Sequence, residues 1–170
     1  MPINGVNCNI DLSGRNHLHA TIKSRIRKGV GLKTVVVGVP IFKKGNRRTR
    51  PLRILLDSGS DGDIAFLTRS DFLKYEAVQR SYPSTWNTSN GVFQTSEVAK
   101  MDLLFPEFSQ SRIFSCTADV KIISVNDNPT YDLIIGIETL GRWKSLLDFC
   151  DRVVTLDGLQ APMKSNDELM

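Results

Sequence analysis

The sequence predicts a mostly β domain, and three observations support this fold class. Short apolar and β-branched segments recur along most of the chain, as in "KTVVVGVPIF" at 33–42. Turn-forming residues separate these segments, for example Asn-Gly at 90–91. Helical patterns are confined to one or two short stretches, which favours an all-β architecture with one short C-terminal helix.

The first expected elements form a hairpin with a basic tip. Strands over 34–42 and 51–56 flank the charged, turn-forming segment 43–50. The next segment, 63–75, begins as a strand and runs into a short helix. Residues 84–105 predict two strands about a Ser-Asn-Gly turn, because Asn-Gly is a strong two-residue hairpin signal.

The second half of the chain predicts more short strands. Residues 111–125 predict another pair of β segments. An apolar strand at 132–135 then breaks at Gly136 into a short helix near 138–144. Residues 145–156 predict a final hairpin.

Composition indicates a single domain of ordinary type. The chain has 170 residues, of which 41% are hydrophobic and 24% are charged. We expect a domain over 31–158, an N-terminal extension or polyprotein linker over 1–30, and a C-terminal tail over 159–170. No apolar run approaches the roughly 18 residues of a membrane helix, and signal-peptide features are missing, so an intracellular, cytoplasmic location is expected. The odd number of widely spaced cysteines argues against a disulfide framework: Cys8, Cys116 and Cys150.

Charge is distributed unevenly along the chain. Residues 1–53 carry twelve basic residues and one acidic residue, a net charge of +11, whereas residues 54–170 have a net charge of −7. The basic residues cluster at 23–29 and 43–50. Nucleic-acid binding through 23–50 is one interpretation. A solvated tail and a charged hairpin tip are favoured, because no aromatic residue lies within either cluster.

The acid-rich stretch "PLRILLDSGSDGDIAFL" at 51–67 has several possible uses. As a calcium loop it places Asp57, Asp61 and Gly62 at suitable positions. Gly59 and Thr68, however, stand where a calcium loop needs an oxygen ligand and a bidentate carboxylate. A solvated turn after a strand is the plainest alternative, since Asp, Ser and Gly favour turns. The tripeptide Asp-Ser-Gly is common and by itself a weak signal, and a phosphorylatable degradation signal based on it is equally weak.

An aspartic protease loop is the remaining interpretation of this stretch. That chemistry needs a carboxylate at the end of a buried strand, presented on a tight loop. The apolar run 54–56 supplies the buried strand, and Asp57 is then the catalytic group. Ser58 supplies a bracing hydroxyl, and Gly59 allows close approach of the backbone.

Four motifs in order resemble the retropepsins, the aspartic proteases of retroviruses and LTR retrotransposons. They are "LLDSGS" at 55–60, "NTSNGVF" at 87–93, "DLIIGIETLGRW" at 132–143 and "SLLDFCDRVVTL" at 145–156. The resemblance spans roughly residues 32–157 and implies a closed β fold with one half-site per chain. One departure is Ile137, where retroviral members carry arginine, and it favours the retrotransposon subgroup.

The resemblance also implies roles for individual residues. Asp57 matches the catalytic aspartate. Support of the active-site loop is implied for Ser58, Gly59, Ser60 and Gly136. Substrate binding is implied for Asp61 and for three residues at the flap tip, Gly91, Val92 and Phe93.

The dyad chemistry implies a second copy of the chain. Two carboxylates about 3 Å apart share one proton and act as base and acid on a water and the peptide carbonyl. The chain has a single Asp-[Ser/Thr]-Gly, because Asp11 and Asp157 lack this spacing. A homodimeric endopeptidase is expected, without metal or cofactor, acting on its own polyprotein and located in the cytoplasm or a virus-like particle. A domesticated, non-cleaving dimerisation or peptide-binding module is the alternative.

Other patterns are weaker. Cys8 with His17 and His19 lacks the spacing of a zinc finger or knuckle, and a polar tail is favoured. The sequon at 87–89 is expected to be silent without a signal peptide. Trp86 and Trp143 are expected in the core or at the flap base.

Overall fold

The computed structural model describes residues 32–43, 49–89, 91–165 and 168. Residues Lys33–Lys164 form one compact unit. The predicted extension over 1–30, the basic cluster at 23–29 and the Cys8, His17 and His19 group lie outside the described residues, as does most of the basic hairpin tip.

The described chain is mostly β, as predicted. It contains two short helices, α2 (Arg69–Phe72) and α3 (Ile137–Arg142). Its strands are β1 (Leu32–Lys33), β2 (Val35–Ile41), β3 (Leu52–Leu56), β4 (Ile64–Thr68), β5 (Glu76–Thr88), β6 (Gly91–Leu104), β7 (Ile113–Ile123), β8 (Leu133–Ile135), β9 (Leu146–Asp148), β10 (Val153–Leu156), β11 (Leu159–Pro162) and β12 (Lys164–Ser165).

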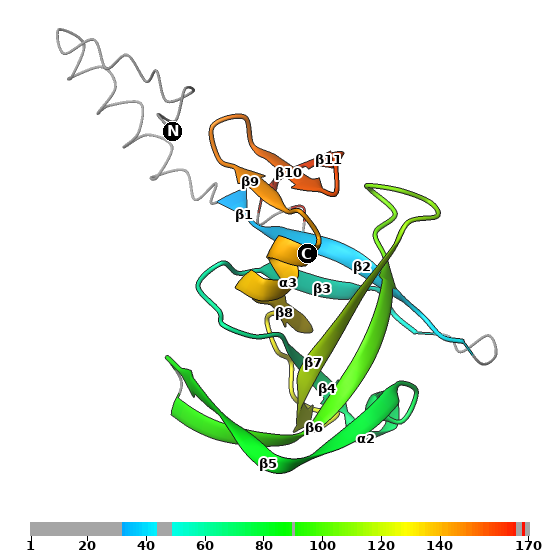
Figure 1. The fold of residues 1–170 in the computed structure, drawn as a ribbon, viewed down its shortest axis with the longest axis vertical. Helices are drawn as coiled ribbons and strands as arrows, with labels where there is room; N and C mark the ends of the chain where they lie inside the picture. Colours follow the sequence, from blue (N-terminus) through cyan, green and yellow to red (C-terminus); the bar gives the residue numbers. More distant parts are fainter. Residues whose placement is uncertain (1–31, 44–48, 90, 166–167, 169–170) are drawn as a thin grey trace, which may run out of the picture. The chain divides into compact units, whose positions relative to one another are not determined.

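Six strands close into a barrel. The large sheet has the order β2-β3-β8-β4-β7-β6-β5, and β2 also pairs with β6, which closes the ring. Within the described residues, strand β5 pairs with β6 alone, so the β5/β6 hairpin extends beyond the barrel (Figure 1). The parallel pairs β3–β8 and β4–β7 place the loop after β3 beside the end of β8. The predicted closed β fold is therefore confirmed.

Several elements differ from the sequence-based expectation. Residues 76–83, for which no strand was predicted, are the first part of β5. The expected pair of segments at 111–125 is one strand, β7. Residues 159–162, expected in the C-terminal tail, form β11 against β10. The helix in 63–75 is present as α2, which begins after Thr68, whose hydroxyl accepts a hydrogen bond from the Asp71 backbone amide at 3.2 Å.

The core fills the barrel with alternating side chains. In β3, residues 52, 54 and 56 are buried while 53 and 55 are partly exposed, the period of a strand with one face inward. Phe105 lies at the centre of an aromatic cluster. Its ring centroid is 5.6 Å from that of Trp143 and 5.3 Å from that of Phe114. Trp143 is 5% exposed, so the expectation of a core position is met for this tryptophan.

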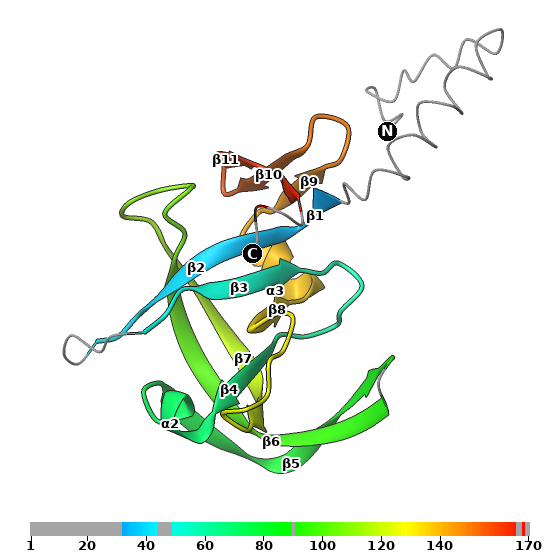
Figure 2. The same ribbon diagram turned by 180° about the vertical axis from the view of Figure 1, so that it is seen from behind.

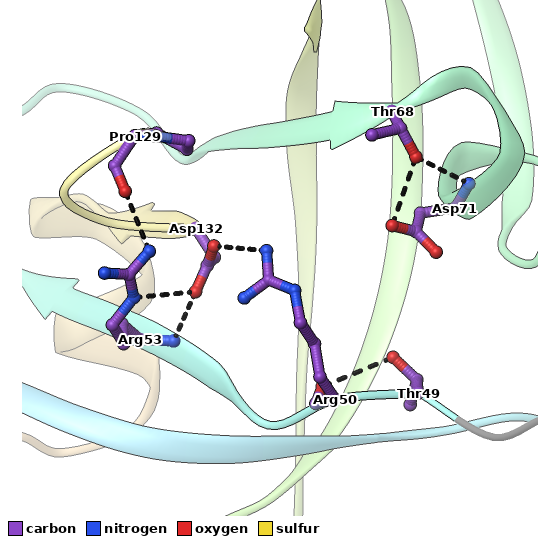
Figure 3. A network of polar contacts seen from close by, with 7 residues as sticks. All are labelled: Thr49, Arg50, Arg53, Thr68, Asp71, Pro129 and Asp132. Carbon is purple, nitrogen blue, oxygen red and sulfur yellow. Dashed lines mark hydrogen bonds and ion pairs between the residues drawn. The ribbon is translucent and has the colours of Figure 1, made fainter. Parts of the chain in front are cut away.

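A buried carboxylate fixes β8 between its two neighbours (Figure 3). Asp132 is fully buried and immediately precedes β8. Its carboxylate accepts hydrogen bonds from the Arg53 backbone amide at 2.8 Å and from the Arg50 guanidinium at 2.7 Å. Its backbone carbonyl accepts a bond from the Phe66 amide of β4 at 2.9 Å. One residue therefore ties together β3, β4 and β8, the strands that lead to the candidate site.

Ionisation of Asp132 depends on these contacts. Burial alone acts to raise the pKa of the Asp132 carboxyl. The hydrogen bonds from Arg50 and Arg53 outweigh burial and hold the pKa below its ordinary value. Asp132 therefore stays ionised, and its contacts stabilise the strands most strongly at neutral pH.

Candidate active site

Asp57 begins the tight loop that joins β3 to β4. The preceding residue, Leu56, is 1% exposed, so the carboxylate emerges directly from the core. The Asp57 backbone amide donates to the Ile135 carbonyl of β8 at 2.9 Å, and its own carbonyl accepts from the Ser60 amide at 3.1 Å. The side chain accepts one hydrogen bond, from the Gly59 amide to Oδ1 at 2.9 Å. The structure thus places a half-buried carboxylate on a backbone-braced turn.

Ser60 and Gly136 form the contact between the two chain segments of the site. The Ile137 amide donates to the Ser60 carbonyl at 2.8 Å, and the Ser60 hydroxyl donates to the Gly62 carbonyl at 2.8 Å. A Cβ at Gly136 would lie 2.5 Å from the Gly62 carbonyl oxygen and 2.7 Å from that of Ser60. Only glycine allows the backbones to approach this closely.

Ser58 and Asp61 face outward from the same loop. Both are exposed. Among the described residues, neither side chain has a hydrogen-bond partner within the chain. Their polar groups are therefore available to a second molecule, whether a peptide or another copy of the chain.

Asp63 is a site residue to which sequence reasoning assigned no role. It is 7% exposed, and its carboxylate accepts hydrogen bonds from the Gly136 amide at 2.7 Å and the Thr139 hydroxyl at 2.5 Å. Burial raises the pKa of Asp63 above its ordinary value, and the bonds from Thr139 and Gly136 offset only part of the effect. The one signal in the sequence was a third acid directly before the apolar run of β4.

A groove of about 620 Å³ lies between this loop and the β5/β6 hairpin. Its lining includes residues 59–63 of the loop, Arg80 and Trp86 of the hairpin, and Thr139 and Arg142 of α3. In Figures 1 and 2 the β3–β4 loop and the hairpin tip extend toward the same side of the barrel. The groove therefore lies beside the loop that carries Asp57, although Asp57 itself is not among its lining residues.

The hairpin tip is only partly as the sequence suggested. Gly91 has a φ of 116°, the positive value that an Asn-Gly turn needs, and Val92 is 68% exposed. Phe93, expected to close on a substrate, instead stacks on Trp86 with ring centroids 6.5 Å apart. The Lys121 ammonium group lies over the Phe93 ring, with Nζ 4.2 Å from the ring centroid. Of the described residues, none of the three expected tip contacts lines the groove in this structure.

Asp119 of β7 is a second site residue that sequence reasoning missed. It is 5% exposed. Its Oδ2 accepts hydrogen bonds from Trp86 Nε1 at 2.9 Å and from the Thr95 hydroxyl at 3.0 Å. Its Oδ1 forms an ion pair with the Arg80 guanidinium at 2.7 Å. The local sequence carried no signal, because all three partners lie 24 or more residues away.

The described residues offer no obvious metal site or membrane span. No group of three or more His, Cys, Asp or Glu side chains is placed to hold a metal ion in the part of the chain that the structure describes. Within the same residues, no helix is long and apolar enough to span a membrane.

Comparison with solved structures gives an informative likeness. No family model matches the chain, and no curated protein matches its sequence. Among solved structures, the retroviral protease-like domain of Ddi1 from Leishmania major aligns over 79% of this chain and 95% of that chain, with a TM-score of 0.53 and 14% identity. The chain has a retropepsin-like fold. A Legionella pneumophila protein of unknown function aligns with a TM-score of 0.36 and 11% identity, over 66% of this chain and 87% of that one.

Proposed function

We propose that the chain is one half of a homodimeric aspartic endopeptidase with Asp57 as its catalytic group. The observation that carries the proposal is the position of Asp57, on a backbone-braced turn at the end of a buried strand of a retropepsin-like barrel. The adjoining groove of about 620 Å³ lies between the loop that carries Asp57 and the β5/β6 hairpin, where an extended peptide would bind.

The chemistry follows from pairing two Asp57 carboxylates. Within one chain the carboxylate accepts a single hydrogen bond, from Gly59, which leaves acceptor sites for a shared proton and a water. Two carboxylates about 3 Å apart cannot both be ionised, so one is protonated at working pH. The ionised group removes a proton from the water as it attacks the peptide carbonyl, and the protonated group donates to that carbonyl oxygen.

In the proposed dimer, the second copy would contact the Asp57 loop and its neighbourhood through residues that are exposed in the single chain. The Ser58 hydroxyl would brace the opposite loop, and Ile137, 48% exposed, is hydrogen-bonded through its backbone amide to Ser60 of the same loop. Leu146 and Phe149, 58% and 60% exposed, follow in the next hairpin. Covering these apolar side chains would stabilise the pair of chains.

The substrate class is an extended polypeptide. The β5/β6 hairpin would pair with the peptide backbone by strand addition, while the groove accepts alternate side chains. From the sequence motifs, we further propose that the natural substrate is the polyprotein of a retrotransposon-like element in which the chain is encoded.

The test is cleavage of a pooled peptide library between pH 4 and 7, with and without a pepstatin-type inhibitor. Asp57→Asn should lower kcat/KM by at least about a hundredfold while the fold is retained, because it removes the ionisable group and keeps the shape. Asp61→Asn on the same loop is the matched control and should have a smaller effect. If Asp57→Asn cleaves at the wild-type rate, Asp57 is not the catalyst. A wild-type dimer that binds the inhibitor without any cleavage would favour the non-cleaving peptide-binding module.

A further inference from the structure

The outer half of the β5/β6 hairpin, beyond the part of β6 that pairs with β7, is bonded to the barrel through the Asp119 carboxylate. Every described residue of β5 is exposed except Ser84 and Trp86, so this strand contributes no buried side chain. Of the described residues between Ser84 and Thr95, only Thr95 is buried. Apolar packing therefore does little to hold the outer half of the hairpin. Polar contacts to Asp119 of β7 take its place.

All three donors to Asp119 come from the hairpin. Trp86 and Arg80 lie on β5, Thr95 lies on β6, and Asp119 itself lies on a barrel strand. The pairing of β5 with β6 is interrupted between Gln79 and Ser84. Arg80 lies in this interruption, and its guanidinium reaches across to Asp119. The carboxylate thus links both strands of the hairpin to β7.

The same residue contacts the active-site loop. The Asp119 backbone amide donates to the Asp63 carbonyl at 2.9 Å. The indole of Trp86, which donates to the Asp119 side chain, lies against Gly62: a Cβ built at Gly62 would be 3.4 Å from the ring. The loop and the hairpin therefore meet at Trp86, and Asp119 is bonded to both.

We infer that Asp119 is a positioning residue, which holds Trp86 against Gly62 and so sets the position of the hairpin over the groove. The inference rests on the proposed endopeptidase function only for its effect on substrate. Asp119 is among the residues that line the groove, but it is only 5% exposed, and its carboxylate oxygens are occupied by the donors from Trp86, Thr95 and Arg80. It acts on peptide binding through Trp86, which lines the groove.

We expect substitution of Asp119 to weaken peptide binding and to leave the rate of the chemical step almost unchanged. Asp119→Asn keeps one acceptor oxygen for Trp86 and Thr95. Its NH2 group then faces the Arg80 guanidinium, and because both groups are hydrogen-bond donors, the contact with Arg80 is lost. Losing a charge-assisted bond should raise KM for a peptide about tenfold. The kcat value should stay within about twofold, because Asp57 and its turn are unchanged. Trp86→Phe, which keeps the ring stack and removes the N–H, should raise KM in the same direction.

The primary test is hydrogen exchange on the full chain, which needs no catalytic activity. In Asp119→Asn, amides at 84–88 and 92–95 should exchange about tenfold faster, while amides at 113–117 of β7 keep wild-type rates. Arg80→Gln changes an exposed side chain, so it should fold, and it should show a weaker form of the same pattern. Glu76→Gln is the matched control, because its ion pair with Lys100 joins the same two strands without reaching β7.

The outcomes separate this inference from the proposed function. Equal acceleration across the hairpin and the barrel would show that Asp119 contributes only to global stability, and would overturn the inference. Unchanged exchange in the hairpin would overturn it as well. If the wild-type chain cleaves no peptide but the hairpin alone loosens, the proposed function fails and the positioning role stands. If kcat falls while KM is unchanged, the positioning role fails and the proposed function stands.

Discussion

The Asp63 carboxylate accepts a hydrogen bond from the Gly136 backbone amide at 2.7 Å, across two segments 73 residues apart in sequence. The bond joins the Asp57 loop to the start of α3, and the Thr139 hydroxyl donates to the same carboxylate. The relative position of the two segments therefore depends on one buried acid. Its ionisation has a direct consequence for stability.

Asp63 should make the protein more stable at acidic pH. Its pKa is raised by burial, so its contribution to the free energy of unfolding is fully present below the unfolded value of about 3.9 and is lost as pH rises through the raised pKa. In Asp63→Asn this pH dependence should disappear. Urea unfolding of both proteins from pH 3 to 8 measures it. A constant difference in unfolding free energy across that range would contradict the expectation.

Asp132 should stabilise the protein more at neutral pH than at acidic pH, the opposite of Asp63. Its pKa is held below the ordinary value, so its contribution is fully present above about pH 3.9 and is lost as pH falls through the lowered pKa. Asp132→Asn should reduce the free energy of unfolding at pH 7 by about 3 kcal/mol, because Arg50 and Arg53 lose their charged partner. The same urea series measures the effect. If the difference in unfolding free energy between the wild type and Asp132→Asn became larger at acidic pH, this account would be refuted.

Proteolysis should depend on protein concentration and on Ser58. Each proposed site needs one Asp57 from each of two chains, so specific activity should fall on dilution below the dimer dissociation constant. Ser58→Ala should raise that constant by about two- to tenfold, since one bracing hydrogen bond contributes roughly 0.5–1.5 kcal/mol. Sedimentation and activity are measured over the same dilution series. Full specific activity in a monomer would exclude the homodimer.

Gly91→Val should slow turnover more than it harms folding. Gly91 has a φ of 116°, which a β-branched residue resists, and open space surrounds its Cβ position, so backbone strain is the only effect. Gly158→Val, at a φ of 82° in the β10–β11 turn, is the matched control with similar strain away from the groove. We expect a loss of kcat/KM for Gly91→Val alone. Equal activity of the two variants would place the functional lid elsewhere.

Local patterns were sufficient to predict most of the barrel. The apolar segment at 51–56 and the Asn-Gly signal at 90–91 depend only on neighbouring residues, and both led to the observed strands. Residues 76–83 were missed because the first part of β5 is exposed throughout and has no apolar face to reveal a period. An edge strand paired on one side only needs no such face.

The polar residues that assemble the site were harder to predict. Asp57 could be proposed from the sequence because its loop is contiguous. The roles of Asp63 and Asp119 depend on partners that the barrel topology brings together from 24 to 76 residues away. Nothing in the local sequence distinguishes such an aspartate from one in a solvated turn. Phe93 was misplaced for a related reason, since its stacking partner lies on the opposite strand of the hairpin.

Strand β6 has a mechanical consequence for the proposed lid. Its residues 97–104 pair with β7 in the barrel wall, whereas, among the described residues, 91–95 pair with β5 alone. In its backbone pairing the proposed lid is therefore a two-stranded cantilever clamped near Glu97, and the bonds from Trp86 and Thr95 to Asp119 restrain its rotation there. At a rise of about 3.3 Å per residue, its lever arm is about 20 Å, so a rotation of about 10° at the clamp displaces the tip by about 3.5 Å. We expect the stiffness at the clamp to control how far the lid travels.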